Sequence, residues 1–169
     1  MATTLPRQGR GVERVTVDLH DTPHPASAAR LQLRSALERW RLDAETVDSA
    51  VLMVSELVGN AVRHTGGEVQ VRALVAEAAG AATASTPTGT AATLRVEVLD
   101  ASQRPPIMRR TGADAEGGRG LVLVERLAER WGYDPGPLQR GKVVWFELCA
   151  TQEPAPVMGG TRRAGPSRR

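Results

Sequence analysis

A glutamate and an asparagine stand four residues apart within the longest helical pattern of the chain, in residues 55–60. At about 100° per residue, this spacing puts Glu56 and Asn60 on one helix face, and His64 follows one turn later. A carboxylate can polarise a water or a hydroxyl, and an amide oxygen suits a hard cation such as Mg²⁺. Such pairs are also common on solvated helices, and the spacing alone favours an ordinary surface.

A second candidate is the carboxylate of Asp100, which ends a predicted strand. At that position it can accept a hydrogen bond from the amine of a base, and an ordinary turn explains it equally well. Ser102 and the prolines at 105–106 then give the chain a fixed departure from the strand.

A third candidate is the glycine-rich run Gly117, Gly118, Arg119 and Gly120, which precedes an apolar helical pattern that starts at Leu121. The free N–H groups and the dipole at a helix N-terminus favour phosphate, and a cation adds to this preference. A glycine-rich linker is the alternative. Linkers seldom run directly into an apolar helix, however.

The helix that carries Glu56 and Asn60 is predicted by its apolar spacing. Its apolar residues recur at intervals of 4, 3, 4 and 3: Val47, Val51, Val54, Val58 and Ala61. Asp43 is the expected N-cap, and the glycines at 66–67 should end the helix. An earlier helix should run from the prolines at 23 and 25 to Trp40, with an apolar side that includes Leu31, Leu33 and Leu37.

Strands are predicted at 12–19, 69–75, 94–99, 131–133 and 142–148, and a third helix from the glycine-rich run to about residue 130. In the third strand, Arg95 and Glu97 should face away from the core. The order of elements predicts an α+β fold, a two-layer sandwich with helices on one face of a mixed, mostly antiparallel sheet. We expect one domain over 11–150 with a flexible loop insert at 77–92, and disorder at 1–10 and 151–169.

The 169 residues carry a formal net charge of +3. The segment 151–169 holds four arginines against one glutamate, which accounts for the whole excess and leaves the first 150 residues neutral. With only five aromatic residues, the chain has no basic and aromatic surface of the kind that binds nucleic acid. We therefore expect no direct binding to nucleic acid.

Cys149, the single cysteine, excludes an internal disulfide and a multi-cysteine zinc site. No apolar run reaches the length of a signal peptide or a membrane span, so we expect a cytoplasmic protein without membrane contact. Lys142, the single lysine, is followed by two valines. A Walker A loop, which needs Gly-Lys-Ser/Thr, is therefore absent.

In their order along the chain, the three groups of residues resemble the motifs of the Bergerat-fold (GHKL) ATPases. The resemblance is closest to the small anti-sigma-factor serine/threonine kinases of actinobacterial type, which have a single HATPase domain. The matching segments are 55–64 as the N box, 98–106 and 117–121 as the two glycine boxes, and the closing segments 130–132 and 141–148. The resemblance covers about residues 12–149 and implies a sandwich of Bergerat type.

The resemblance also implies roles for individual residues. Glu56 would act as the general base, Asn60 would coordinate Mg²⁺, and Asp100 would bind the adenine amine. The nucleotide-binding set that it implies is Asn60, Asp100, Ser102, Gly118, Arg119, Gly120 and Leu121. Within this set, Gly118 and Gly120 would lie against the phosphates and Arg119 near the γ-phosphate. His64 is expected to be a rim or capping residue.

Three features depart from the family pattern. Ser102 stands where many GHKL ATPases have glycine, Gly59 replaces a more usual polar residue, and the span from Asp100 to Gly117 is short for an ATP lid. These departures bear on affinity and turnover more than on which nucleotide binds.

Two functions from different classes follow from these observations. The first is an ATP- and Mg²⁺-dependent kinase that phosphorylates an anti-anti-sigma (STAS) protein and exchanges it for a sigma factor. The second is a nucleotide-gated binding module of anti-sigma type without significant kinase activity. A detached histidine-kinase ATPase domain is disfavoured because the sequence shows no dimerisation helix. The oligomeric state stays open, a homodimer included.

Overall fold

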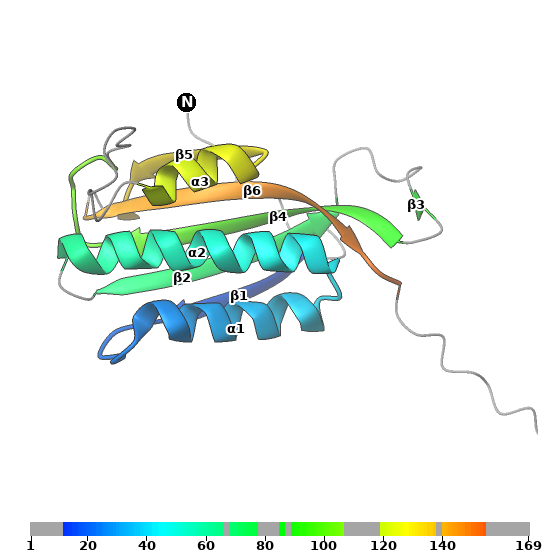
Figure 1. Cartoon of the computed structure of the whole chain (residues 1–169), viewed down its shortest axis with the longest axis horizontal. Coiled ribbons are helices and arrows are strands. Elements are labelled where there is room, and N and C mark those ends of the chain that lie inside the picture. Colours follow the sequence, from blue (N-terminus) through cyan, green and yellow to red (C-terminus); the bar gives the residue numbers. More distant parts are fainter. Residues whose placement is uncertain are drawn as a thin grey trace, which may run out of the picture.

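The computed structural model describes residues 12–65, 68–77, 85–86, 89–106, 119–137 and 140–154. These residues form two layers, with helices covering one face of a sheet (Figure 1). The layers confirm the predicted α+β sandwich. None of the described helices has the length and apolar content of a membrane span.

Every pairing among the described strands is antiparallel. The sequence predicted a mixed sheet, and the parallel part of that prediction is not found among these strands. The strands are β1 (Glu13–Asp18), β2 (Val69–Glu77), β3 (Ser85–Thr86), β4 (Gly89–Asp100), β5 (Arg130–Pro135) and β6 (Lys142–Gln152). Their order across the sheet is β1-β2-β4-β6-β5, and the short β3 pairs with β4. The long strands β2, β4 and β6 therefore form the centre.

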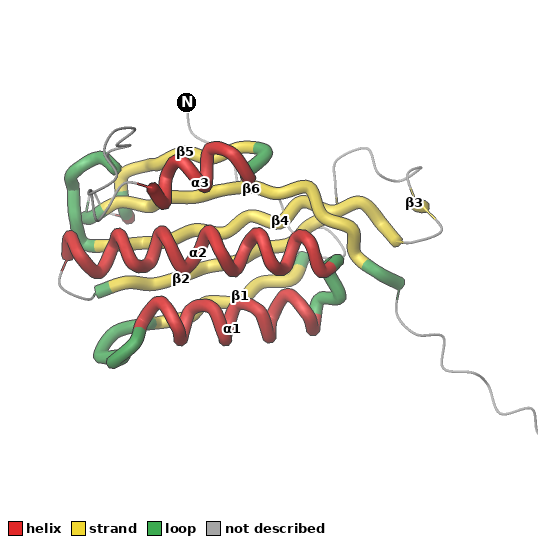
Figure 2. Tube along the Cα trace, viewed as in Figure 1, coloured by secondary structure: helices red, strands yellow, loops and turns green. Residues whose placement is uncertain are grey.

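The helices are α1 (Pro25–Arg39), α2 (Ala44–Thr65) and α3 (Arg119–Leu127) (Figure 2). Asp43 caps α2 as predicted, because its Oδ1 accepts the Thr46 N–H at 2.9 Å and its Oδ2 accepts the Thr46 hydroxyl at 2.9 Å. The predicted apolar stripe of α2 is buried along its whole length. The third helix ends at Leu127, earlier than expected, and β5 begins three residues later.

The core lies between α1, α2 and the sheet. Alternate strand residues point into it, and the largest fully buried side chains include Met53, Val71, Val75, Leu94, Val96 and Phe146. In α1, Leu33 and Leu37 are buried, whereas Leu31 is 73% exposed and was wrongly placed on the apolar side. Two residues along a helix correspond to a turn of about 200°, so Leu31 points away from the face that holds Leu33.

Two strands extend further than predicted. β4 begins at Gly89, inside the expected loop insert at 77–92, and β6 continues to Gln152, past the expected domain end at 150. The extensions pair with each other, Thr90 opposite Gln152. A polar, alanine-rich composition does not prevent this pairing, because backbone groups make the ladder bonds. Within the expected insert, residues 78–84 and 87–88 lie outside the described part.

The end of β6 is also hydrogen-bonded to the junction between α1 and α2. The Thr151 N–H donates to Asp43 Oδ2 at 2.8 Å, and the Gln152 side-chain amide donates to the Trp40 carbonyl at 2.9 Å. The cap of α2 is therefore bonded to the sheet as well as to its own helix.

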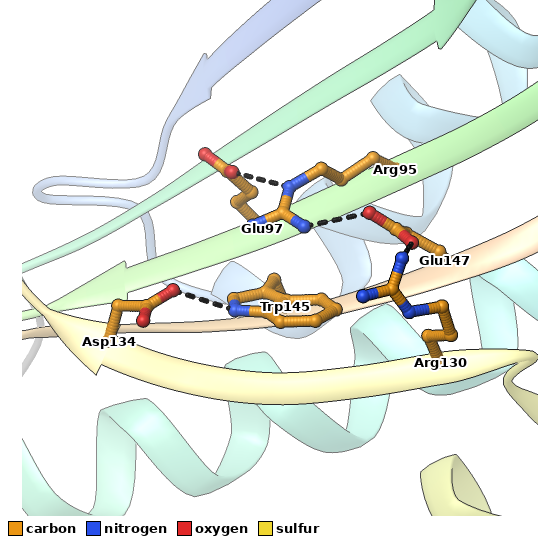
Figure 3. Close-up of polar contacts among 6 residues, drawn as sticks. All are labelled: Arg95, Glu97, Arg130, Asp134, Trp145 and Glu147. Carbon is orange, nitrogen blue, oxygen red and sulfur yellow. Dashed lines mark hydrogen bonds and ion pairs between the residues drawn. The ribbon is translucent and has the colours of Figure 1, made fainter. Parts of the chain in front are cut away.

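The face of the sheet opposite the helices, here called the helix-free face, carries a polar cluster. It consists of Arg95, Glu97, Arg130, Asp134, Trp145 and Glu147 (Figure 3). Arg95 donates to Glu97 at 2.8 Å and to Glu147 at 2.9 Å, and its guanidinium carbon lies 4.1 Å from the centroid of a Trp145 ring. Arg95 and Glu97 thus face away from the core as predicted, although Arg95 is only 9% exposed.

The topology brings the C-terminal end of α2 to one end of the sheet. Four residues after α2 ends at Thr65, Val69 opens β2 opposite Asp100, and Asp100 in turn lies opposite Lys142. The last turns of α2 and the ends of three strands therefore meet in one region.

Candidate functional site

Gly120 lies directly against the two candidate residues of α2. A Cβ atom at position 120 would be 2.9 Å from both Cβ and Oε2 of Glu56 and 3.0 Å from Nδ2 of Asn60. Cβ atoms almost never approach other atoms below 3.0 Å, so only glycine allows this contact without a shift. The structure thus brings together three predicted site residues from two distant motifs.

The helix α3 is held in this position by its apolar side. Leu121 is 3% exposed and Val124 is fully buried in the core. The first turn of α3, whose N–H groups have no partner within the helix itself, therefore lies beside Glu56 and Asn60. Positive partial charge at this helix end favours a carboxylate or a phosphate nearby.

Asn60 is oriented by its neighbours. Its amide nitrogen faces Gly120, and its Oδ1 accepts a hydrogen bond from the Arg63 guanidinium, one turn further along α2. The oxygen that could bind a metal therefore already faces a cation.

The donor set fits a magnesium ion that is shared with phosphate groups. In the described residues, no cluster of three or more His, Cys, Asp or Glu side chains could hold a metal. Mg²⁺ bound together with a nucleotide uses only one or two protein oxygens, the remainder being phosphate oxygens and water. The amide oxygen of Asn60, on the same helix face as the Glu56 carboxylate, would supply one such ligand.

Asp100 forms a second cluster at the end of β4, where its side chain is 3% exposed. Its Oδ1 accepts the Ser102 N–H at 2.8 Å and the Lys142 ammonium, also at 2.8 Å. The Ser102 hydroxyl in turn accepts the Arg104 N–H at 3.2 Å. Asp100 is thus both a turn residue and one half of a buried ion pair.

Lys142 reaches Asp100 because of Gly141. Gly141 has a φ of +67°, and a Cβ atom there would lie 1.9 Å from the Asp100 carbonyl oxygen. Only glycine permits this approach of β6 to β4. In the sequence, Lys142 excludes a Walker A loop and stands in the closing segment 141–148, but no site role was predicted for it. Its alternation with Val144 and Phe146, which puts it on the core face, could have indicated its role.

The structure describes the other predicted residues only in part. Gly118 lies outside the described residues, and of Arg119 only the backbone, which opens α3, is described. His64 is exposed in the last turn of α2, and its expected rim or capping role stays a prediction. Within the described part, no hydrogen bond or ion pair joins Asp100 to Glu56 or Asn60. The site therefore consists of two adjacent clusters.

A cavity of about 650 Å³ reaches Asp100 and Lys142. Its wall also contains Asp18, Gln70 and Leu99, whose side chains belong to the helix-free face. Glu56, Asn60 and Gly120 are not among its described lining residues. As far as the described lining residues show, the cavity lies against the Asp100–Lys142 pair and apart from the contact between α2 and α3.

A family model described as a histidine kinase-like ATPase domain matches residues 19–148. The chain belongs to this family. No curated protein matches it. As a histidine kinase-like ATPase domain of GHKL type, it is an ATP-binding domain. The match spans α2, the end of β4, the start of α3 and the start of β6, which supply the two clusters.

Proposed function

We propose that the protein is an ATP- and Mg²⁺-dependent serine/threonine kinase that acts on an anti-anti-sigma (STAS) protein. Phosphorylation of that protein would release it and allow a sigma factor to bind in its place. The observation that carries the kinase proposal is the packing of Gly120 on Glu56 and Asn60. The choice of partner rests on the resemblance of the motifs to anti-sigma-factor kinases.

The contact between α2 and α3 offers the groups that phosphoryl transfer requires. Transfer depends mainly on positioning and on relief of negative charge. The N–H groups of the first turn of α3 would bind phosphate oxygens, and Glu56 would accept the proton of the attacking hydroxyl. Asn60 would hold Mg²⁺, which neutralises phosphate charge when bound.

The second cluster supplies the other end of the nucleotide site. A carboxylate that is fixed at one oxygen presents its other oxygen in a defined direction. Asp100, fixed at Oδ1 by Ser102 and Lys142, would accept the adenine amine in this way. Its burial excludes competing water, which strengthens such a bond.

The experiment compares Glu56→Gln and Asn60→Ala with the wild type, by transfer of labelled phosphate to candidate STAS proteins and by calorimetric ATP affinity with Mg²⁺. Glu56→Gln should still bind ATP and lose transfer, because an amide cannot accept the proton. Asn60→Ala should lose Mg²⁺-dependent binding as well. Glu45→Gln, at an exposed position in the first turn of α2, is the matched control and should behave as wild type.

A different outcome would favour the nucleotide-gated binding module. In that case the wild type binds a STAS protein or a sigma factor only with ATP present, transfers no phosphate to any candidate, and is indistinguishable from Glu56→Gln. Absence of ATP binding by the wild type would contradict both functions.

A further inference from the structure

Lys142 lies where the proposed function puts the nucleotide base. We propose that Lys142 is a base-reading residue, whose ammonium donates a hydrogen bond to the ring nitrogen N1 of adenine while Asp100 accepts the adjacent amine. The inference rests on the proposed function, which assigns the adenine amine to Asp100. It adds a second reading group and a reason for selecting adenine.

The position of Lys142 is fixed by the fold. The register of β4 and β6 places it directly opposite Asp100, and Gly141 brings the two backbones into contact. Its side chain is 10% exposed and that of Asp100 is 3% exposed, with Nζ 2.8 Å from Oδ1. The ammonium therefore does not move freely in solvent, as a surface lysine does.

After their mutual hydrogen bond, Asp100 keeps one oxygen, Oδ2, as an acceptor, and the Lys142 ammonium keeps further N–H donors. The Ser102 N–H and Lys142 both donate to Oδ1, which uses the two lone pairs of that oxygen. An incoming amine must therefore bind Oδ2. An ammonium has three N–H donors, and within the described residues Lys142 directs a hydrogen bond to Asp100.

Adenine matches this arrangement. Its amine is a donor and the neighbouring ring nitrogen N1 is an acceptor, which complement a carboxylate oxygen and an ammonium. Guanine presents the reverse, with a carbonyl oxygen beside an N–H, so its oxygen would face the carboxylate and its N–H would face the ammonium. Polar groups left unpaired in a buried site reject the wrong ligand strongly.

The test changes the ligand first, so that folding is not affected. Binding of ATP, 1-deaza-ATP and 7-deaza-ATP to the wild-type protein is measured by calorimetry with Mg²⁺. In 1-deaza-ATP a C–H replaces N1, and binding should be about 10- to 100-fold weaker than for ATP, as expected for loss of a charge-assisted hydrogen bond. In 7-deaza-ATP a different ring nitrogen is replaced, so this nucleotide is the matched control and should bind as ATP does.

Two variants then assign the effect to Lys142. Lys142→Met keeps the length of the side chain without the ammonium, and should bind ATP and 1-deaza-ATP equally. Lys142→Arg restores a donor and should recover part of the preference for ATP. Circular dichroism confirms that each variant is folded before its affinities are compared.

The outcomes separate the two proposals. If the wild type binds ATP and 1-deaza-ATP equally, or if Lys142→Met keeps the wild-type preference, the role of Lys142 is overturned and the proposed function stands. If the wild type binds no ATP, both are overturned.

Discussion

Two helical glycines, Gly120 and Gly59, differ in the space that a side chain would find. A Cβ atom at Gly120 would collide with Glu56 and come within 3.0 Å of Asn60, whereas at Gly59 the nearest atom would be Arg63 Nη1 at 3.6 Å, an ordinary contact. We expect Gly120→Ala to lower the phosphate transfer rate by about 10²-fold, because small displacements of reacting groups are costly. Transfer and ATP affinity measured side by side check this.

Gly59→Ala is the matched control for Gly120→Ala. It should leave ATP binding unchanged and raise the free energy of unfolding by about 0.5–1 kcal/mol, since alanine loses less backbone entropy in a helix. Equal activities in the two variants would show that the approach of α3 to α2 is not needed for the chemistry.

At the scale of elements, Asp43 joins the start of α2 to the end of β6. Partial burial alone would raise the pKa of its carboxyl, but hydrogen bonds from the Thr151 N–H and from the N–H and hydroxyl of Thr46 outweigh burial and hold the pKa below its ordinary value. The stabilisation that comes from this lowered pKa is therefore fully present above about pH 4–5 and is lost as the pH falls through the folded-state pKa.

We accordingly expect Asp43→Ala to lower the free energy of unfolding at pH 7 by about 1–2 kcal/mol, as for loss of an N-cap. The deficit relative to wild type should shrink at pH 3, below the ordinary pKa of an aspartate, because the unfolded chain then binds the proton. Urea unfolding at both pH values measures this. Asp48→Ala, which removes an exposed acid from the same helix, should leave stability nearly unchanged, and a deficit independent of pH for Asp43→Ala would contradict the assignment.

The strands β4 and β6 are linked across the helix-free face by Arg95. Arg95→Ala removes the cation between Glu97 and Glu147 and uncovers Trp145, so we expect a loss of about 3 kcal/mol in the free energy of unfolding. Arg14→Ala, on an exposed position of the same face in β1, should cost less than about 0.5 kcal/mol. Urea unfolding of both variants makes the comparison, and similar losses would show that the cluster contributes no more than an ordinary surface.

For the whole molecule, the sequence predicted what local chemistry controls. The capping of α2 by Asp43 depends on Thr46, three positions further along the chain, and the apolar stripe of α2 depends on spacing alone, so both were predicted. The extension of β6 to Gln152 was not, because its bonds to Asp43 and Trp40 join residues more than 100 positions apart.

The same reasoning applies to the candidate site. The motifs named Glu56, Asn60, Gly120 and Asp100, but the packing of Gly120 on α2 depends on how α3 docks. The pairing of Lys142 with Asp100 depends on a strand register that joins residues 42 positions apart. The family resemblance therefore identified the candidate site residues, whereas the side chains that they contact could be found only from the tertiary structure.

Because the buried Lys142 is the single lysine of the chain, a lysine-specific endoproteinase has one peptide bond to cut, at the start of β6. The folded protein should resist this protease, and the rate of cutting should report how often the end of the sheet opens. ATP should slow the cutting of the wild type, because a ligand that binds only the closed form reduces the open population. Rapid cutting that ATP does not change would show that this end of the sheet opens independently of the nucleotide.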